Sequence, residues 1–286
     1  MRKKALRWTN WIREQELETL GPCLKHLAER SARLLEIGGG NGLQAKLLAE
    51  MGFEVISIDP SPRKPSLFDV QTGDCTKIEF DDDSFDVVFS SNVLEHVADL
   101  SKGLVEMKRV LRPGGIMIHT MPTPTSTVLT MLIQPIGYIF GLCFVAKEGW
   151  KFFQSRFSKL RGKNKSQKCS LQKVSSKNEK SLDKKNIYAT LKMLNPLRLI
   201  ITQPHGSSVC SFAELRTWRK KVWRERFEKS GFTVKRVLDL PLSYSRHNIF
   251  PFGFISLRRF LAKVCLTSCV GYILTVEDDE QHGALD

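Results

Sequence analysis

The stretch Leu34-Leu35-Glu36-Ile37-Gly38-Gly39-Gly40-Asn41-Gly42 decides how this chain folds. An apolar strand containing one carboxylate runs into a loop with glycine at every second position, and we expect a helix to begin just after the loop. Glycine permits a tight turn and lets a ligand approach the main chain, because no Cβ stands in the way. A dinucleotide fingerprint, G-x-G-x-x-G, would need its last glycine at position 43, which is Leu43. The G-x-G-x-G spacing therefore favours a nucleoside-containing ligand that lies across the loop.

The residues that follow alternate between strand and helix patterns. Residues 54–58 alternate like a half-buried strand and stop at Asp59, and an acid at the tip of a second strand can bind both hydroxyls of a ribose. Further strand patterns occupy 85–91, 116–119, 232–238 and 271–276, and helical patterns occupy 11–32 and 43–51. We therefore predict an α/β fold: a Rossmann-like, doubly wound, mostly parallel seven-stranded sheet with an inserted apolar and basic segment.

Motifs in this region resemble, in order and at ordinary spacings, those of the class I S-adenosylmethionine-dependent methyltransferases. They are Glu36–Gly42, Asp59, Gly73-Asp74, Asn92–Val97 and Arg109–Gly115. The chain is most similar to the type-11 branch, which includes the ubiquinone and menaquinone methyltransferases, and the resemblance covers residues 33–121. It implies S-adenosylmethionine as the cofactor.

The resemblance implies roles for the residues of the glycine loop. Glu36 would help to orient the methionine end of the cofactor, and Gly38, Gly40 and Gly42 would let the backbone approach the adenosyl group. A structural interpretation stays open, because a tight strand–helix turn can need glycine for packing alone.

It also implies roles for residues at later strand ends. Asp59 would accept hydrogen bonds from the ribose hydroxyls, and Asp74 would accept one from the adenine amino group, with the Cys75 N–H facing a ring nitrogen. Ser91 and Asn92, after the fourth strand, would line the floor beneath the sulfonium. The alternative for Asp74 is a turn-forming role.

Methyl transfer asks the protein mainly to align a nucleophile and exclude water, because the sulfonium is already activated. An oxygen or nitrogen nucleophile can need a general base, and histidine is the usual candidate near neutral pH. We rank His205, in a turn sequence, first, then His119 at the end of the fifth strand, then His96. For each, a structural role is the alternative, and for His96 this includes helix capping.

Composition limits the kinds of protein that this chain can be. A chain of 286 residues with 42% hydrophobic residues can form one large domain, or a domain with an insertion. Its seven cysteines include no C-x-x-C pair, which argues against a zinc site or disulfide framework and favours a reducing, cytoplasmic location. We expect no metal ion and no signal peptide, since the basic N-terminus lacks an apolar core.

The domain prediction follows from these patterns. Residues 1–32 form an N-terminal helical segment, 33–125 and 205–276 the methyltransferase domain, and 126–204 an apolar and then lysine-rich insertion. The formal net charge is +14, and residues 147–185 hold thirteen Lys or Arg against three acids, an excess of +10. We expect a solvated loop there, or a surface for an anionic partner.

Two segments indicate membrane contact. Residues 128–146 carry no charged side chain and are nearly as long as the about 20 residues that span a bilayer. A single crossing would separate the last two strands from the sheet, so we expect a helix or broken hairpin that enters one leaflet, or a cap over the active site. Residues 249–263 mix aromatic and cationic side chains, as interfacial segments do. The alternative is that the two segments pack on each other as core.

We therefore predict a methyltransferase that acts on an O, N or C nucleophile of a small acceptor, hydrophobic or lipid-linked, with peripheral membrane contact on the cytoplasmic face. Nucleic acid is the less favoured partner. Two alternatives stay open: an RNA methyltransferase that uses the basic insertion, and a non-catalytic cofactor-binding scaffold.

Overall fold

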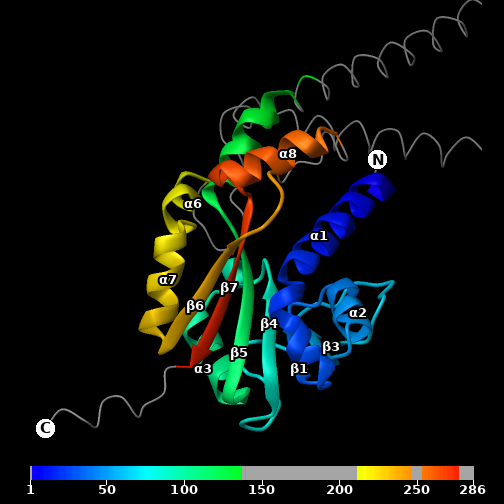
Figure 1. Cartoon of the computed structure of the whole chain (residues 1–286), viewed down its shortest axis with the longest axis vertical. Helices are drawn as coiled ribbons and strands as arrows, with labels where there is room; N and C mark the ends of the chain where they lie inside the picture. Colours follow the sequence, from blue (N-terminus) through cyan, green and yellow to red (C-terminus); the bar gives the residue numbers. More distant parts are fainter. Residues whose placement is uncertain (1, 137–138, 140–210, 246–252, 277–286) are drawn as a thin grey trace, which may run out of the picture. The chain divides into compact units, whose positions relative to one another are not determined.

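The computed structural model describes residues 2–136, 139, 211–245 and 253–276 (Figure 1). His205, the basic run 147–185 and parts of the segments 128–146 and 249–263 lie outside these residues. The chain divides into two compact units, one of residues 1–130 and 204–286 and the other of residues 131–203. The first unit contains the sheet and every contact discussed below.

The elements of the first unit follow the predicted alternation, with residues 124–130 helical after the fifth strand. In chain order they are α1 (Arg2–Glu29), β1 (Arg33–Ile37), α2 (Leu43–Glu50), β2 (Glu54–Asp59), β3 (Val70–Thr72), β4 (Phe85–Ser91), a 3₁₀ turn (Leu94–His96), α3 (Leu100–Val110), β5 (Leu111–Pro122), α6 (Ser211–Thr217), α7 (Lys220–Lys229), β6 (Phe232–Asp239), α8 (Ile255–Leu261), a π-helical turn (Ala262–Leu266) and β7 (Cys269–Val276).

The strands form one seven-stranded sheet in the order β3-β2-β1-β4-β5-β7-β6. The first five strands in this order, β3 to β5, are parallel to one another, and β7 runs antiparallel to both β5 and β6. The predicted Rossmann-like, mostly parallel fold is therefore confirmed. Strand order reverses between β1 and β4, so the carboxyl ends of β1, β2 and β4 flank a topological switch point, where open α/β sheets bind their ligands.

Alternating side chains give the sheet a core on each face. Val87 and Phe89 of β4 belong to the cluster with α1 and α2, whereas Val88 belongs to the cluster with α3 and α7. Figure 1 shows these helices against the sheet. Each fully buried large apolar side chain contributes roughly 1.5–3 kcal/mol, so the two clusters hold β4 and the carboxyl end of β1 in fixed positions.

Element bounds differ most from prediction in α1 and β5. Helix α1 begins at Arg2 and ends at Glu29, where the pattern predicted 11–32. Strand β5 runs from Leu111 to Pro122, and residues 112–115 form a bulge, because Leu111 pairs with Phe85 while Ile116 pairs with Val87. The strand therefore begins before the predicted pattern at residues 116–119 and extends beyond it.

None of the helices within the described residues is both long and apolar enough to cross a membrane. The described part of the chain also holds no group of three or more His, Cys, Asp or Glu residues placed to bind a metal ion.

Candidate active site

The glycine loop needs glycine for both conformation and space. Gly38, Gly40 and Gly42 have φ angles of 79°, 58° and 74°, in the left-handed region. A Cβ on Gly38 would lie 2.3 Å from a methyl carbon of Val93, and one on Gly42 would lie 2.8 Å from the backbone N of Phe68. The loop therefore packs tightly on residues that follow β2 and β4, and it cannot accept side chains at these positions without rearrangement.

Asp59 ties the loop to the tip of β2. Its Oδ2 accepts a hydrogen bond from the Gly40 N–H at 2.9 Å, and its Oδ1 accepts one from the Ser61 N–H at 2.8 Å. The N–H groups of Gly38 and Gly39 donate to the Ile58 carbonyl at 2.7 and 3.1 Å. The structure thus brings together the glycines and the acid that the sequence singled out.

Glu36 is a buried carboxylate beneath this loop, with 2% of its surface exposed. Ser57 Oγ donates a hydrogen bond to its Oε2 at 2.5 Å. Burial raises the pKa of Glu36 to about 7, and the nearby Asp59 raises it further, against the lowering effect of the Ser57 hydrogen bond. A cationic group that approached Glu36 would favour its ionised form.

Asp74 follows β3 at the same edge of the sheet. The Gly73 N–H donates to the Asp59 carbonyl at 3.2 Å, which places the two acids on neighbouring strand ends. The exposed Asp74 side chain accepts from the Thr76 N–H at 2.8 Å, so it does shape a turn, as the structural alternative supposed. The Cys75 side chain is buried in the α3 cluster, and burial raises the pKa of its thiol to about 11.

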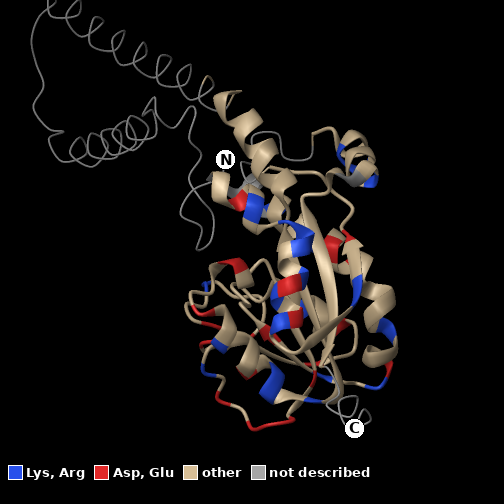
Figure 2. Cartoon of the chain, turned by 90° about the vertical axis from the view of Figure 1, so that its left-hand side faces the viewer, with Lys and Arg blue, Asp and Glu red and all other residues tan. Residues whose placement is uncertain are grey.

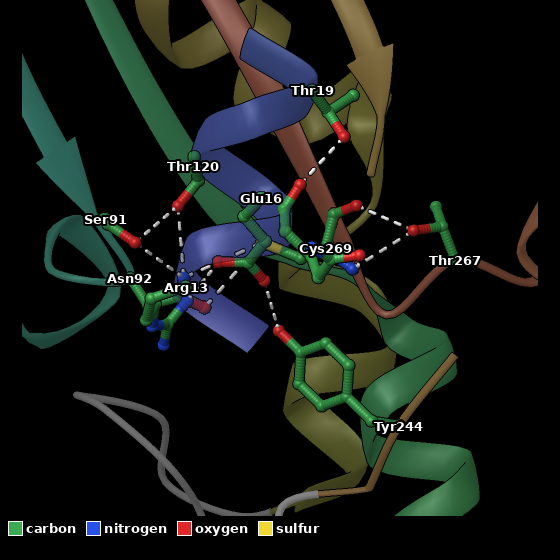
Figure 3. A network of polar contacts seen from close by, with 10 residues as sticks. Arg13, Glu16, Thr19, Ser91, Asn92, Thr120, Tyr244, Thr267 and Cys269 are labelled. Atoms are coloured by element: carbon green, nitrogen blue, oxygen red, sulfur yellow. Dashed lines mark hydrogen bonds and ion pairs between the residues drawn. The ribbon is translucent and has the colours of Figure 1, made fainter. Parts of the chain in front are cut away.

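The carboxyl end of β4 sends its polar side chains to both faces of the sheet. Ser91 and Asn92 lie with Thr120 of β5: Asn92 Nδ2 donates to Thr120 Oγ1 at 3.1 Å, and Thr120 Oγ1 donates to Ser91 Oγ at 2.9 Å (Figure 3). Asn92 has a φ of 52°, a left-handed conformation that asparagine tolerates better than most residues. Ser90 instead bonds His119 within the opposite core.

The three candidate bases lie in different environments. His119 is fully buried, its Nδ1 lies 2.8 Å from Ser90 Oγ, and its ring stacks on Phe227 at a centroid distance of 5.8 Å. Burial lowers the pKa of His119 to about 3, which suits a neutral core residue better than a base that meets a substrate. His96 is partly exposed, with Nε2 3.9 Å from Glu95 Oε1, and burial lowers its pKa. His205 lies outside the described residues.

Sequence reasoning missed a polar cluster that two distant segments bring to this edge. Arg13 of α1 pairs with Glu16 at 2.6 Å, and the hydroxyl of Tyr244 donates to the other Glu16 oxygen at 2.7 Å (Figure 3). Burial acts to lower the pKa of Arg13, but Glu16, Tyr244 and Cys269 outweigh it and raise that pKa overall. The sequence signal for this cluster is weak: Arg13 and Glu16 stand three residues apart, between the apolar residues Ile12 and Leu17, which the structure buries.

Glu95 lies nearby, in the turn after β4, and is 4% exposed. Burial raises its pKa to about 7, while the positive charge of Arg13 acts to lower it. The burial of Glu95 within reach of the Arg13 charge is a finding of the structure.

Comparison with known proteins decides what kind of domain holds this site. Residues 35–119 match the type-11 family described as "Methyltransferase domain". The chain contains a methyltransferase domain. S-adenosylmethionine is the cofactor of such domains, and the loop, Asp59 and Asp74 all lie within the matched residues of this one. Arg13, Glu16 and Tyr244 lie outside them.

The similar curated proteins match less than half of this chain. A ubiquinone biosynthesis O-methyltransferase of Paramagnetospirillum magneticum is 32% identical over 130 residues, which cover 42% of this chain and 52% of the relative. A demethylmenaquinone methyltransferase of Beutenbergia cavernae is 37% identical over 121 residues, covering 39% and 48%. The chain thus spans about half the length of the curated relatives it matches. A solved S-adenosylmethionine-dependent methyltransferase from Mesorhizobium loti is similar with 13% identity and a TM-score of 0.45, over 90% of this chain and 97% of that one.

Proposed function

We propose that this protein is an S-adenosylmethionine-dependent methyltransferase that transfers a methyl group to an O, N or C nucleophile of a small, hydrophobic or lipid-linked acceptor. The observation that carries the proposal is the hydrogen bond from the Gly40 N–H to Asp59, 2.9 Å long. It fixes a loop of left-handed glycines against an acid at the topological switch point, within a matched methyltransferase domain.

The residues present fit the cofactor. Gly40 leaves space beside the backbone for the adenosyl group, because no atom comes closer than 4.0 Å to the position of a Cβ there, while Gly38 and Gly42 let the loop pack on Val93 and Phe68. Glu36 would gain its charge as the ammonium group of the methionine end approached, because a nearby cation favours the carboxylate. Asp59 would bind the ribose hydroxyls and Asp74 the adenine amino group. The cofactor supplies an activated methyl group, and the protein positions it and excludes water.

Two observations support a hydrophobic acceptor. The relatives reported above are named for ubiquinone biosynthesis and for demethylmenaquinone. In addition, the uncharged segment 128–146 follows a few residues after β5, whose carboxyl end lies beside the site.

Membrane contact through residues 128–146 and 249–263, on the cytoplasmic face, belongs to the same proposal. Within the second segment, α8 has no fully buried residue. Its outward side chains are apolar and the adjoining ones basic: Phe254, Leu257, Phe260 and Val264 are 71%, 52%, 60% and 49% exposed, and Arg259 and Lys263 are exposed beside them. An apolar face flanked by cations suits the surface of an anionic bilayer.

Calorimetric titration with S-adenosylmethionine and with its demethylated product tests the cofactor site. We expect Asp74→Ala to weaken binding by about tenfold, the effect of one lost hydrogen bond to a charged group. Asp81→Ala, a matched change of another exposed aspartate, should leave binding unchanged. Equal affinities of the wild type and Asp74→Ala would remove Asp74 from the site, and no binding by the wild type would refute the proposed function.

A further inference from the structure

We propose that Arg13 binds an acidic oxygen of the methyl acceptor, a phenolate, enolate or carboxylate carried on an apolar body. This inference rests on the proposed function and adds the chemical class of the acceptor to it.

The position of Arg13 is the first argument. Figure 3 places it beside Glu16 and Asn92, at the edge where β4 and β5 end. The Sγ atom of Cys269 lies 3.7 Å from the Asn92 amide nitrogen, and the positive charge of Arg13 acts to lower the pKa of the Cys269 thiol. The next residue, Val93, packs on Gly38 of the cofactor loop. Residues 92–93 therefore connect the surroundings of Arg13 to the loop, and we infer from this that a nucleophile aligned with the cofactor's methyl group would lie within reach of the guanidinium.

The unused hydrogen-bonding capacity of Arg13 is the second argument. A guanidinium carries five N–H groups, and Nη1 donates to Glu16. Among the described residues, no hydrogen-bond acceptor meets Nε or Nη2 of Arg13. The Arg13 side chain is 22% exposed, whereas that of Glu16 is 1% exposed. The Arg13 side chain is thus partly accessible to an incoming group, whereas the carboxylate that holds it is not.

The way Arg13 is held is the third argument. Glu16 accepts from Arg13 at one oxygen and from the Tyr244 hydroxyl at the other. Both oxygens of this carboxylate are engaged, so Glu16 orients the guanidinium from behind and stays directed at Arg13 and Tyr244. Tyr244 anchors the pair from the connection between β6 and β7. A pre-oriented guanidinium binds oxyanions with geometric specificity, because its parallel N–H groups match their lone pairs.

The test uses the whole protein, loaded with the demethylated cofactor product, and two probes of equal size. One probe is 4-octylbenzoate, an anion at pH 7.5, and the other is 4-octylbenzamide, its neutral counterpart. We expect the wild type to bind the benzoate about tenfold or more tightly than the benzamide, as one charge-assisted hydrogen bond would give. Arg13→Gln should abolish this preference while affinity for the benzamide persists. Arg7→Gln, a change of an exposed arginine of the same helix, should keep it.

Outcomes are kept separate by titrating each variant with S-adenosylmethionine and recording its thermal unfolding. If Arg13→Gln is unfolded, Arg13→Lys replaces it; lysine can still pair with Glu16 but lacks the fork of N–H groups, so the preference should fall. A wild type that binds both probes equally or neither probe, or an Arg13 variant that keeps the full preference, would overturn the inference. If the wild type does not bind S-adenosylmethionine, that result would instead refute the proposed function.

Discussion

Glu36 is a carboxyl group whose protonation the fold controls. Burial raises its pKa from 4.5 to about 7, so the folded state binds a proton more tightly than the unfolded state does. Its contribution to stability is therefore present in full below pH 4.5 and is lost as the pH rises from 4.5 through 7. At pH 8 the folded protein bears the cost of a buried anion.

Glu36→Gln should consequently stabilise the protein at pH 8, because the amide is neutral and can still accept from Ser57. The difference of 2.5 pKa units corresponds to an upper limit of about 3 kcal/mol in the free energy of unfolding. Chemical denaturation at pH 8 and pH 4 measures it, and the gain should nearly vanish at pH 4. A variant with the same relative stability at both pH values would contradict the raised pKa.

Gly42 and Gly114 form a matched pair of left-handed glycines, with φ angles of 74° and 73°. A Cβ on Gly114 would meet nothing within 4 Å, whereas one on Gly42 would lie 2.8 Å from the Phe68 backbone. Gly114→Ala should cost only the conformational strain, roughly 1–2 kcal/mol. Gly42→Ala should cost more and also weaken cofactor binding, because the loop must move. Thermal unfolding and titration with S-adenosylmethionine would show this, and equal effects of the two changes would contradict it.

At this scale, local sequence singled out the residues of the proposed cofactor site and missed the cluster of Arg13, Glu16 and Tyr244. Glu36, the glycines and Asp59 lie within a continuous strand–loop–helix–strand pattern, whose geometry short-range spacing determines. Glu16 and Tyr244 are 228 positions apart, and no periodicity links residues that only the packing of α1 on the end of the sheet brings together.

At the scale of elements, α1 contacts the segment after β6 through the buried Glu16 carboxylate as well as through apolar packing on Leu240 and Leu242. Removing the Tyr244 hydroxyl would leave one oxygen of Glu16 without its partner in a nearly inaccessible position. We expect Tyr244→Phe to lower the free energy of unfolding by about 1–3 kcal/mol. The control is Tyr272→Phe, whose hydroxyl makes a longer bond, 3.3 Å, to the Lys220 carbonyl and should contribute less. A larger loss for Tyr272→Phe would contradict the fastening of α1 by Glu16.

Helix α8 carries the prediction for membranes. Leu257→Glu combined with Phe260→Glu should reduce co-flotation with vesicles that contain anionic lipid by about tenfold or more, since two apolar side chains would be replaced by anions. Val105→Glu, on α3, changes a residue that is likewise exposed, at 62%, and should leave flotation unchanged. Flotation that is unaffected by the α8 changes would remove this helix from any membrane contact.

Element types were more predictable than element directions and bounds. Apolar periodicity identified the strands of the sheet except β3, because burial on one or both faces dictates it, and the three residues of β3 include none that is fully buried. It does not encode the direction of a strand, so the antiparallel course of β7 follows only from its pairing with β5 and β6. The bulge at residues 112–115 also arises from the pairing of β5 with β4.

At the scale of the whole molecule, charge is unevenly distributed along the chain. Of the net charge of +14, +10 falls in residues 147–185, and the remaining 247 residues carry 31 Lys or Arg against 27 acids. Basic and acidic residues accordingly mix around the sheet in Figure 2. A basic run favours binding to anionic lipid and to RNA alike. Charge alone therefore does not identify the acceptor, and the methylated product itself has to be found.

The measurement that tests the central claim most directly is the transfer of label from methyl-tritiated S-adenosylmethionine into a membrane-containing cell extract, followed by separation of organic-soluble, RNA, protein and small polar fractions. We predict counts in the organic-soluble fraction that are lost with Asp59→Ala and kept with Asp69→Ala, a change of an exposed aspartate in the same β2–β3 connection. Asp59-dependent counts in the RNA or protein fraction would contradict the hydrophobic acceptor. An absence of Asp59-dependent counts in every fraction would contradict the assignment as an active methyltransferase.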